Sequence, residues 1–400
     1  MRVLLVVETF PPQMGYLVTM LPKYLVRLGV QVHVAAIDLP TYYNLDEFKG
    51  AVPRFLSSQA LRAGSVTEMD GYTVHVLRHR ELLGYPYMRG LGRKIGELRP
   101  DIVYCIMAIG WMPLQAALSK LRHRFKLFTG SHTSAMMFSL ASTRRPTVAA
   151  RTRNLLTRWL PGRAVSLVTE RCYCPTDDCG TVAWRYFGVQ KRKVEIVHLG
   201  VDTDYFYPVA SDAHRQARAA LRQRLGFAPD EIVCIYTGKM TEFKNPVLLA
   251  EALEQLRARG GRFRGLFIGD GAQRERLGRF PASVVLDFMP FHALGDYYRA
   301  ADVAVWLANE STSMLDAAAC GIPIIVSDRI YQDHVTGNGL AYRLNDLSSL
   351  IEMLRTLESA ETRRRMGEAG AHKMRERFTW ELAARKRLHD FELVTNAPRP

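Results

Sequence analysis

Short apolar runs rich in β-branched residues recur along the 400-residue chain and alternate with segments of helical periodicity. Runs of this kind are typical of strands that a parallel sheet buries on both faces. We expect strands at residues 2–7, 31–36, 72–77, 101–106, 125–130 and 165–168, and again at 231–237, 264–268, 284–288, 302–307 and 322–326. The length also exceeds what one hydrophobic core normally holds. The sequence therefore predicts an α/β fold with two doubly wound, Rossmann-like parallel sheets facing across a cleft.

A polar cluster follows the predicted strand 302–307 and precedes a helix and a further buried strand. Ser313 has the residue type of a helix N-cap, with Asp316 three positions later and an Ala-rich turn behind it. Ligands of open parallel sheets bind at the carboxyl ends of the strands, where free helix N–H groups favour a phosphate. The pattern thus predicts a binding site at residues 310–316. The alternative interpretation is a capping box that only closes a helix.

Two lysines lie on the loop that follows strand 231–237. Lys239 and Lys244 are five residues apart, between a strand end and a helix start, so that both ammonium groups can face one phosphate. Lysines exposed only to solvent are the alternative. The cysteines Cys172, Cys174 and Cys179 lack zinc-site spacing and a nearby histidine, which favours reduced thiols, no metal and a cytoplasmic location. No apolar stretch suggests a signal peptide or a membrane span.

Positive charge is concentrated in one half of the chain. Residues 1–200 hold 27 Lys and Arg against 13 Asp and Glu, a net charge of +14, out of +15 for the whole chain. Arginines mix with Leu and Trp over residues 144–160, as in an interfacial helix, although an ordinary solvated amphipathic helix is the alternative. We expect the first half to contact an anionic membrane surface. Nucleic acid is not expected as a partner, because no binding motif occurs and the aromatic residues are not interleaved with the basic ones.

The stretch 315–324, Leu-Asp-Ala-Ala-Ala-Cys-Gly-Ile-Pro-Ile, resembles the donor-site signature of retaining glycosyltransferases of the family-4 type (glycosyl transferases group 1). These enzymes have the two-domain GT-B fold. In the family a glutamate begins this helix and a second glutamate lies eight positions earlier. Here Asp316 takes the first place and Ala308 the second, a departure from the pattern. The resemblance implies that Glu310, the nearest carboxylate, fills the role from a shortened loop.

Further matches follow in the order that the family has. A Pro-Pro loop leads to Gly15, with Met14 in place of a first glycine, and His132 falls where similar enzymes place a histidine beside the donor sugar. Asn245 stands where glycine is usual. The segment 194–208 resembles the family's interdomain segment. The resemblance therefore implies an acceptor-binding domain at residues 1–197, a donor-binding domain at 198–378, and a helix at 379–400 that crosses back to the first domain.

The resemblance implies a metal-independent hexosyltransferase that uses a nucleotide diphosphate sugar as co-substrate, with no other cofactor, and a glycan or a lipid-pyrophosphate-linked acceptor. The residues expected to be catalytic are His132, Glu310, Lys239 and Lys244. Those expected to bind the donor are Gly15, Gly238, Lys239, Lys244, Ser313, Met314, Leu315 and Asp316, with Met289, Pro290, Phe291 and His292 near the base. A GT-B epimerase, a non-catalytic sugar-nucleotide binder and a nucleic-acid-binding protein remain alternatives.

Overall fold

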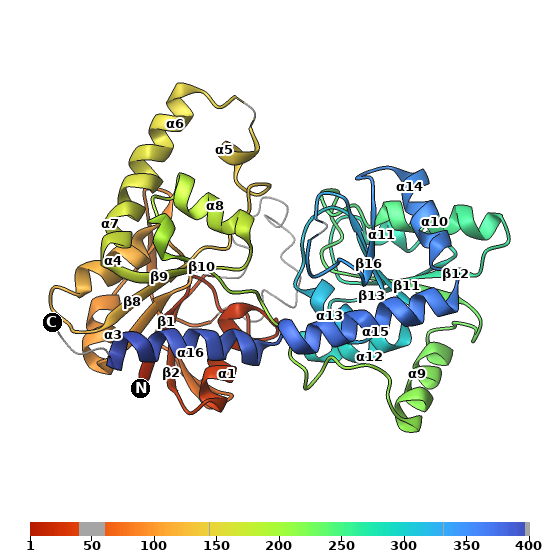
Figure 1. Ribbon diagram of the computed structural model, residues 1–400, viewed down its shortest axis with the longest axis horizontal. Coiled ribbons are helices and arrows are strands. Elements are labelled where there is room, and N and C mark those ends of the chain that lie inside the picture. The colour runs from red at the N-terminus through yellow and green to blue at the C-terminus, as the bar shows by residue number, and fades with distance from the viewer. Residues whose placement is uncertain (40–60, 144, 331, 397–400) are drawn as a thin grey trace.

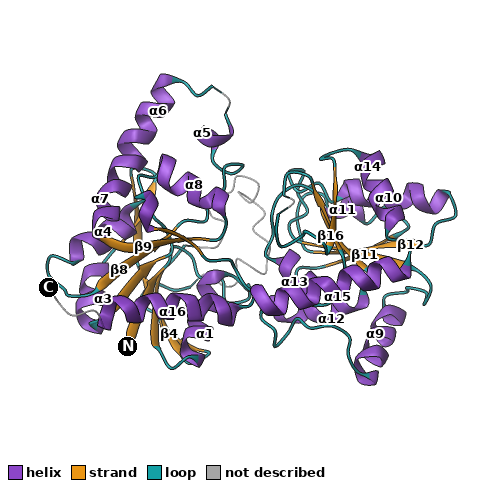
Figure 2. Cartoon of the chain, viewed as in Figure 1, coloured by secondary structure: helices purple, strands orange, loops and turns teal. Residues whose placement is uncertain are grey.

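The computed structural model describes residues 1–39, 61–143, 145–330 and 332–396. Its two large sheets are separate from each other and flanked by helices (Figures 1 and 2). The predicted α/β class and the two parallel-sheet units are confirmed. Residues 40–60, and Arg144 of the basic stretch, lie outside the described residues.

The first sheet has eight strands in the order β10-β9-β8-β7-β1-β2-β4-β3, and all neighbours are parallel except β3 and β4. Its strands are β1 (Arg2–Val6), β2 (Gln31–Ile37), β3 (Val66–Met69), β4 (Tyr72–Leu77), β7 (Ile102–Cys105), β8 (Lys126–Gly130), β9 (Thr169–Cys174) and β10 (Val194–Ile196). A hairpin of β5 (His79–Leu82) and β6 (Tyr85–Met88) stands apart. The strand order reverses at β1, which lies between β2 and β7.

The second sheet has six parallel strands in the order β13-β12-β11-β14-β15-β16. They are β11 (Ile232–Thr237), β12 (Phe263–Ile268), β13 (Ser283–Leu286), β14 (Val303–Trp306), β15 (Ile324–Ser327) and β16 (Gly339–Tyr342). Here the strand order reverses between β11 and β14. Ligands of doubly wound sheets bind at such a switch point.

Helices cover both faces of each sheet. Those of the first unit are α1 (Leu17–Arg27), α3 (Leu91–Leu98), α4 (Trp111–Ser119), α5 (Ser139–Ser142), α6 (Val148–Asn154), the π-helical turn η2 (Leu155–Trp159), α7 (Leu160–Val168), α8 (Asp177–Tyr186) and the 3₁₀ turn η3 (Lys191–Lys193). The second unit has α9 (Asp212–Arg224), α10 (Val247–Ala258), α11 (Arg274–Leu277), the 3₁₀ turn η4 (Phe291–Ala293), α12 (Leu294–Ala300), α13 (Ser313–Ala319), α14 (Leu347–Thr356) and α15 (Ala360–Arg377). The chain continues into α16 (Trp380–Asn396).

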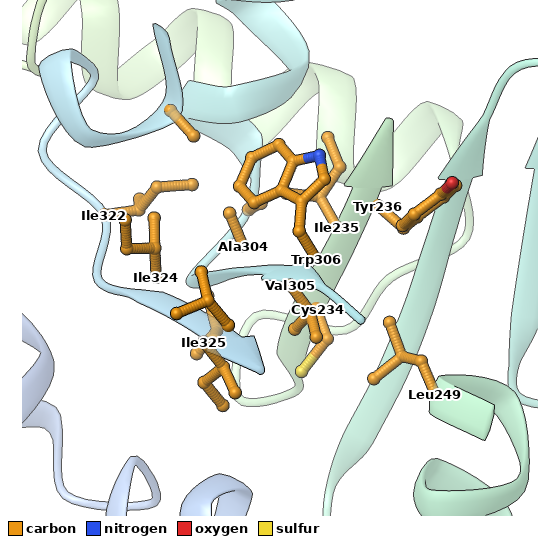
Figure 3. Close-up of a cluster of buried hydrophobic side chains, with 14 of the residues drawn as sticks. Cys234, Ile235, Tyr236, Leu249, Ala304, Val305, Trp306, Ile322, Ile324 and Ile325 are labelled. Atoms are coloured by element: carbon orange, nitrogen blue, oxygen red, sulfur yellow. The ribbon is translucent and has the colours of Figure 1, made fainter. Parts of the chain in front are cut away.

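Each sheet is buried on both faces, as its apolar runs predicted. Along β1, Val3 and Leu5 pack into the core under α1 and α16, whereas Leu4 and Val6 pack into the core under α3, α4 and α7. In the second unit, Figure 3 shows Trp306 and residues of β11 and β15 in one apolar cluster. Successive side chains of a strand point to opposite faces of the sheet. Because both faces are buried here, the strands show no alternation of apolar and polar residues.

The strand predicted at 165–168 is wrong. These residues end α7, and the neighbouring strand β9 begins only at Thr169. Val165 and Ser166 are buried, whereas Leu167 is 64% and Val168 39% exposed, so burial follows helical periodicity. The apolar residues that suggested a strand are divided between the core and the surface of a helix.

The last helix returns to the first unit. Trp380, Ala383, Ala384 and Phe391 of α16 are buried in the same core as β1 and α1. The chain crosses between the two units twice, once in a first crossing segment around Val201 and once in a second around Thr379. These two crossing segments run side by side, because Val201 forms a parallel bridge with Thr379. Its backbone N–H donates to the carbonyl of Phe378 at 2.8 Å. The two units are thus joined through paired backbone.

A buried ion pair fastens the first crossing segment to α1. Lys23 Nζ lies 2.6 Å from Asp202 Oδ2, with side chains 9% and 1% exposed, and the Tyr24 hydroxyl donates to Asp202 Oδ1 at 2.9 Å. Next to it, Arg27 pairs with Asp204 at 2.5 Å, but both of these side chains are nearly half exposed. A buried charge without its partner is costly, whereas an exposed pair contributes little.

We expect Lys23→Met to lower the free energy of unfolding by about 3 kcal/mol, because it leaves the Asp202 carboxylate buried without its cation. The double variant Lys23→Met/Asp202→Asn should recover part of this loss. Arg27→Met is the matched control and should cost less than about 1 kcal/mol. Urea denaturation measures all three. Equal losses for Lys23→Met and Arg27→Met would contradict the assignment.

A histidine pair should make the first unit sensitive to acid. His75 Nε2 lies 3.3 Å from His33 Nδ1, and burial lowers both pKa values, that of His75 to about 4. The unfolded chain, with a histidine pKa near 6.5, then binds more protons than the folded chain. Stability is therefore complete above pH 6.5 and falls as the pH drops toward 4.

We expect His75→Gln to flatten the fall in Tm between pH 6.5 and 4.5, because one of the groups that must take up a proton is removed. The exposed His389, substituted in the same way, is the control and should leave the slope unchanged. Thermal unfolding across this pH range is the measurement. A slope in His75→Gln equal to that of the unaltered protein would refute the role of the pair.

Candidate active site

The loop after β11 carries both predicted lysines at the switch point of the second sheet. The Tyr236 hydroxyl donates to the carbonyl of Lys239 at 2.7 Å, and both lysine side chains are partly buried. Asn245 has φ +49°, a left-handed conformation that asparagine tolerates better than most residues, which explains why it can stand where glycine is usual. Lys244 Nζ approaches the carbonyl of Glu310 at 3.5 Å. The lysine loop and the segment after β14 therefore meet.

A glycine turn after β12 supports the lysine loop. Gly269 has φ +153°, and a Cβ atom there would lie 1.9 Å from the carbonyl oxygen of Gly238. The Met240 N–H donates to the carbonyl of Asp270 at 2.8 Å, and the Gln273 N–H donates to that of Met240 at 2.8 Å. No side chain fits at Gly269 unless the loop that carries Lys239 moves. The turn therefore holds the lysine loop in position.

The helix that follows β14 begins without the predicted capping box. Ser313 is the first residue of α13, the preceding Thr312 makes no side-chain cap, and the Ser313 side chain instead faces the hydroxyl of Tyr298. Met314 and Leu315 have buried side chains within the apolar core, so only their backbone groups can face a ligand. The prediction of Ser313 as the N-cap is wrong, because its hydroxyl is drawn toward Tyr298 on α12.

Asp316 lies on the same short helix, in a partly buried position. Burial, and then the nearby carboxylate of Asp202, raise the pKa of Asp316 well above its usual value. Tyr298, which also faces Asp316, is hydrogen-bonded to Thr237 Oγ1 at 2.6 Å. Hydroxyl groups of a ligand would supply Asp316 with hydrogen-bond donors. The site thus has an acceptor of hydrogen bonds at the junction of β11, α12 and α13.

Glu310 is influenced by a charge of the first unit. Its carboxylate accepts a hydrogen bond from Gln332, and its pKa is raised by burial and then by the carboxylate of Asp178 at the start of α8. Asp178 in turn accepts from the N–H of Ala135 at 2.7 Å, three residues after His132. Ala308, where the family has glutamate, lies at the strand exit, and its carbonyl accepts from Ser327 Oγ at 3.2 Å.

A pocket of about 260 Å³ lies at the carboxyl ends of β1, β7 and β8, next to the switch point of the first sheet. Its lining includes Glu8, Thr9, Ser131, His132 and Thr133, and the rest of the wall is mostly apolar. Burial, and then the charge of Arg387, lower the pKa of His132 to about 4. The imidazole in this pocket is therefore neutral at pH 7.

The two predicted loops near the donor touch each other. A Cβ atom at Gly15 would lie 2.9 Å from Phe291 Cδ2, and the N–H of Phe291 donates to the carbonyl of Gln13 at 3.1 Å. The Phe291 ring meets that of Tyr205 edge to face, with centroids 5.7 Å apart. His292 is exposed, and Met289 and Pro290 are partly buried. Gly15 therefore allows the close approach of the 289–292 loop.

Sequence reasoning missed several polar residues at this site: Asp178, Asp202, Tyr298, Gln332 and Arg387. Asp202 belongs to the Gly-Val-Asp segment that marked the interdomain connection, but nothing in its spacing indicated a buried ion pair. Asp178 stands in the first turn of a helix capped by Thr176, a position that usually serves the helix alone. Contacts between distant segments identify these residues.

No group of His, Cys, Asp or Glu suited to a metal ion occurs within the described parts of the chain. In the same ranges, no helix is both long and apolar enough to cross a membrane.

Two family sequence profiles match most of the chain. The family described as Glycosyltransferase Family 4 matches residues 14–205, and that described as Glycosyl transferases group 1 matches residues 231–359. A D-inositol 3-phosphate glycosyltransferase of Streptomyces bingchenggensis is 28% identical over 305 residues, which are 69% of this chain and 62% of that protein. A GDP-mannose-dependent alpha-(1-6)-phosphatidylinositol dimannoside mannosyltransferase of Mycobacterium tuberculosis is 30% identical over 200 residues, 48% of this chain and 50% of the relative.

The chain thus spans only about three fifths and one half of the length of these two relatives. Among solved structures, HepE from Anabaena in complex with UDP superposes with a TM-score of 0.70 at 15% identity, covering 98% of this chain and 100% of that one. Such a likeness shows the GT-B fold. With both family profiles matched in order, the chain belongs to the group 1 glycosyltransferases of the family-4 type.

Proposed function

We propose that the protein transfers a hexose from a nucleotide diphosphate sugar to an acceptor hydroxyl, with retention of the anomeric configuration. The observation that carries the proposal is the meeting of Lys244 and Glu310 at the switch point of the second sheet. Through Asp178 and the loop that follows β8, this point adjoins the pocket that contains His132. Donor-binding groups from one unit and a sugar-sized pocket in the other are what such a transfer requires.

Breaking the anomeric bond leaves negative charge on the departing pyrophosphate. Lys239 and Lys244 would stabilise that charge without a metal, and donors fixed in advance at a developing charge supply a large part of catalysis. Asp316 would accept hydrogen bonds from the ribose hydroxyls. His132 and Glu310 would orient the sugar, and residues 289–292 would lie near the base. The proposal assigns no covalent nucleophile.

In this proposal, the acceptor-binding unit spans residues 1–197 and the donor-binding unit spans residues 198–378. The crossing helix spans residues 379–400. HepE binds UDP, which supports a nucleotide-sugar donor. The mycobacterial relative is named for a phosphatidylinositol dimannoside, which supports an acceptor at a membrane. We therefore assign the acceptor to the class of lipid-linked sugars or glycans at the cytoplasmic face of a membrane.

A helical arm of the first unit, residues 148–168, is the surface that would contact the membrane. It consists of α6, η2 and α7, and α6 projects beyond the sheet (Figure 1). Leu155, Leu156 and Leu160 are 45%, 59% and 46% exposed. Arg151 and Arg153 are exposed on the same arm. Exposed leucines beside arginines favour the interface of an anionic bilayer.

The first test concerns the donor. Purified protein is incubated with UDP-, GDP- and ADP-sugars, with and without lipid extract, and release of nucleotide diphosphate is followed. We expect turnover of one donor and a loss of about 100-fold in kcat/KM for Lys244→Ala, because the leaving charge loses a partner. The exposed Lys191, substituted by Ala, is the control.

Several results would overturn the transferase. Unchanged turnover by Lys244→Ala would contradict the proposed role of the lysine loop. Conversion of the donor sugar into its epimer, without transfer to an acceptor, would indicate an epimerase. Donor binding without turnover would indicate a non-catalytic binder. Affinity only for nucleic acid, with a steep salt dependence, would place the protein in another class.

The second test concerns the arm. In co-sedimentation with vesicles of phosphatidylglycerol and phosphatidylcholine, we expect Arg151→Gln/Arg153→Gln to bind roughly 30-fold more weakly, at about 1 kcal/mol per arginine. Arg365→Gln, an exposed arginine of α15, should bind like the unaltered protein. Equal binding by both variants, or no preference for anionic over neutral vesicles, would refute a membrane role of the arm.

A further inference from the structure

Behind the pocket wall lie three buried polar groups for which the described residues provide no hydrogen-bond partner: His132 Nε2, the Tyr104 hydroxyl and Arg387 Nε. They come from β7, the loop after β8, and the crossing helix α16. Buried polar atoms are nearly always satisfied, so a group of three that are not calls for a physical explanation. Their positions relative to one another provide it.

The three groups are neighbours. At Gly130, the ideal Cβ position lies 3.0 Å from the Tyr104 hydroxyl, 3.2 Å from the carbonyl of Ile106 and 3.4 Å from His132 Nε2. The Tyr104 hydroxyl also lies close to the guanidinium of Arg387. Through Tyr104, Arg387 of the crossing helix is therefore connected to His132 at the pocket.

Arg387 is fixed in its place. It is 1% exposed, its Nη1 donates to the carbonyl of Ala383 at 2.9 Å, and its guanidinium lies 5.0 Å from the centre of the Tyr173 ring. The Tyr173 hydroxyl donates to Asp390, one turn further along α16, at 3.0 Å. A buried arginine cannot lose its proton and offers only donors. The connection thus begins with a fixed positive charge.

We propose that Arg387 and Tyr104 are positioning residues that hold His132 in the neutral tautomer with its proton on Nδ1. The inference deepens the proposed function and rests on it for the role of the pocket. Arg387 donates to the tyrosine oxygen, Tyr104 donates to His132 Nε2, and the histidine presents Nδ1–H to a sugar hydroxyl in the pocket. In this order each of the three groups has a partner.

Electrostatics favours this tautomer over the other. Nε2 is the ring nitrogen that is buried near Tyr104, whose hydroxyl lies close to the guanidinium. A positive charge near Nε2 attracts a lone pair there and repels an N–H group. The reverse order, in which Nε2–H donates to Tyr104 and Tyr104 donates to the carbonyl of Ile106, points the N–H toward that charge. His132 therefore acts as a hydrogen-bond donor to the sugar and not as a base, since its unprotonated nitrogen is buried.

The first experiment observes the tautomer directly. Long-range ¹H–¹⁵N correlation spectra of the full chain, labelled with ¹⁵N-histidine, are recorded at pH 7, and the His132 signals are assigned as those absent from His132→Asn. We expect protonated Nδ1 and unprotonated Nε2, with a shift toward the other tautomer in Tyr104→Phe. Protonated Nε2 in the unaltered protein, or unchanged populations in Tyr104→Phe, would overturn the inference.

The second experiment uses two replacements of the same ring. The amide nitrogen of asparagine can occupy the position of Nδ1, and that of glutamine the position of Nε2. We expect His132→Gln to lose roughly 10- to 100-fold more kcat/KM than His132→Asn, the effect of one hydrogen bond to the sugar. The reverse order would overturn the assignment of the donor nitrogen.

Substitutions of arginines on the crossing helix α16 test whether the charge of Arg387 sets the tautomer. Arg387→Met should change the tautomer populations and Arg387→Lys should largely restore them, because lysine keeps the charge. Arg385→Met, an exposed arginine of the same helix paired with Glu381, is the control. Equal effects of Arg387→Met and Arg387→Lys would remove the role of the charge. If no donor is turned over, the proposed function fails, whereas the spectra still decide on the tautomer.

Discussion

The arrangement of the two units depends on the buried carboxylate of Asp202. It lies on the first crossing segment, and Lys23 and Tyr24 of α1 both bind it. Because this segment also pairs with the residues before α16, one interaction fixes both crossing segments to the first unit. Because both charges are buried, removing either one leaves the other uncompensated and lowers the stability of the fold. A connection held in this way determines where the proposed donor-binding groups lie relative to the pocket.

Asp202 also affects the candidate donor site. Its charge contributes to the raised pKa of Asp316, so the interdomain connection and the carboxylate proposed to bind ribose are electrostatically coupled. On the other side of the junction, Phe291 fits against Gly15 because that residue has no side chain. The site is thus assembled from loops that touch across the units. Residues of both units determine its electrostatics.

Local patterns predicted much of the architecture. The β-branched runs identified most strands, because a strand that is buried on both faces needs continuous apolar sequence. The lysine loop was also predictable, since a strand end followed by a helix start fixes the positions of Lys239 and Lys244 within one loop. The strand predicted at 165–168 failed for a related reason. An apolar run at the end of a helix and one in a strand look alike until burial separates Val165 from Leu167.

The sequence by itself determined the α/β class, the two repeated units, the family signature at 315–324 and the residues after β11. These features depend on neighbours in the chain. Only the tertiary structure decided that Ser313 does not cap its helix, that Glu310 meets Lys244 and lies near Asp178, and that Arg387 stands behind His132. Each of these contacts joins residues far apart in sequence, and its energy depends on burial. Spacing along the chain contains no information about burial of that kind.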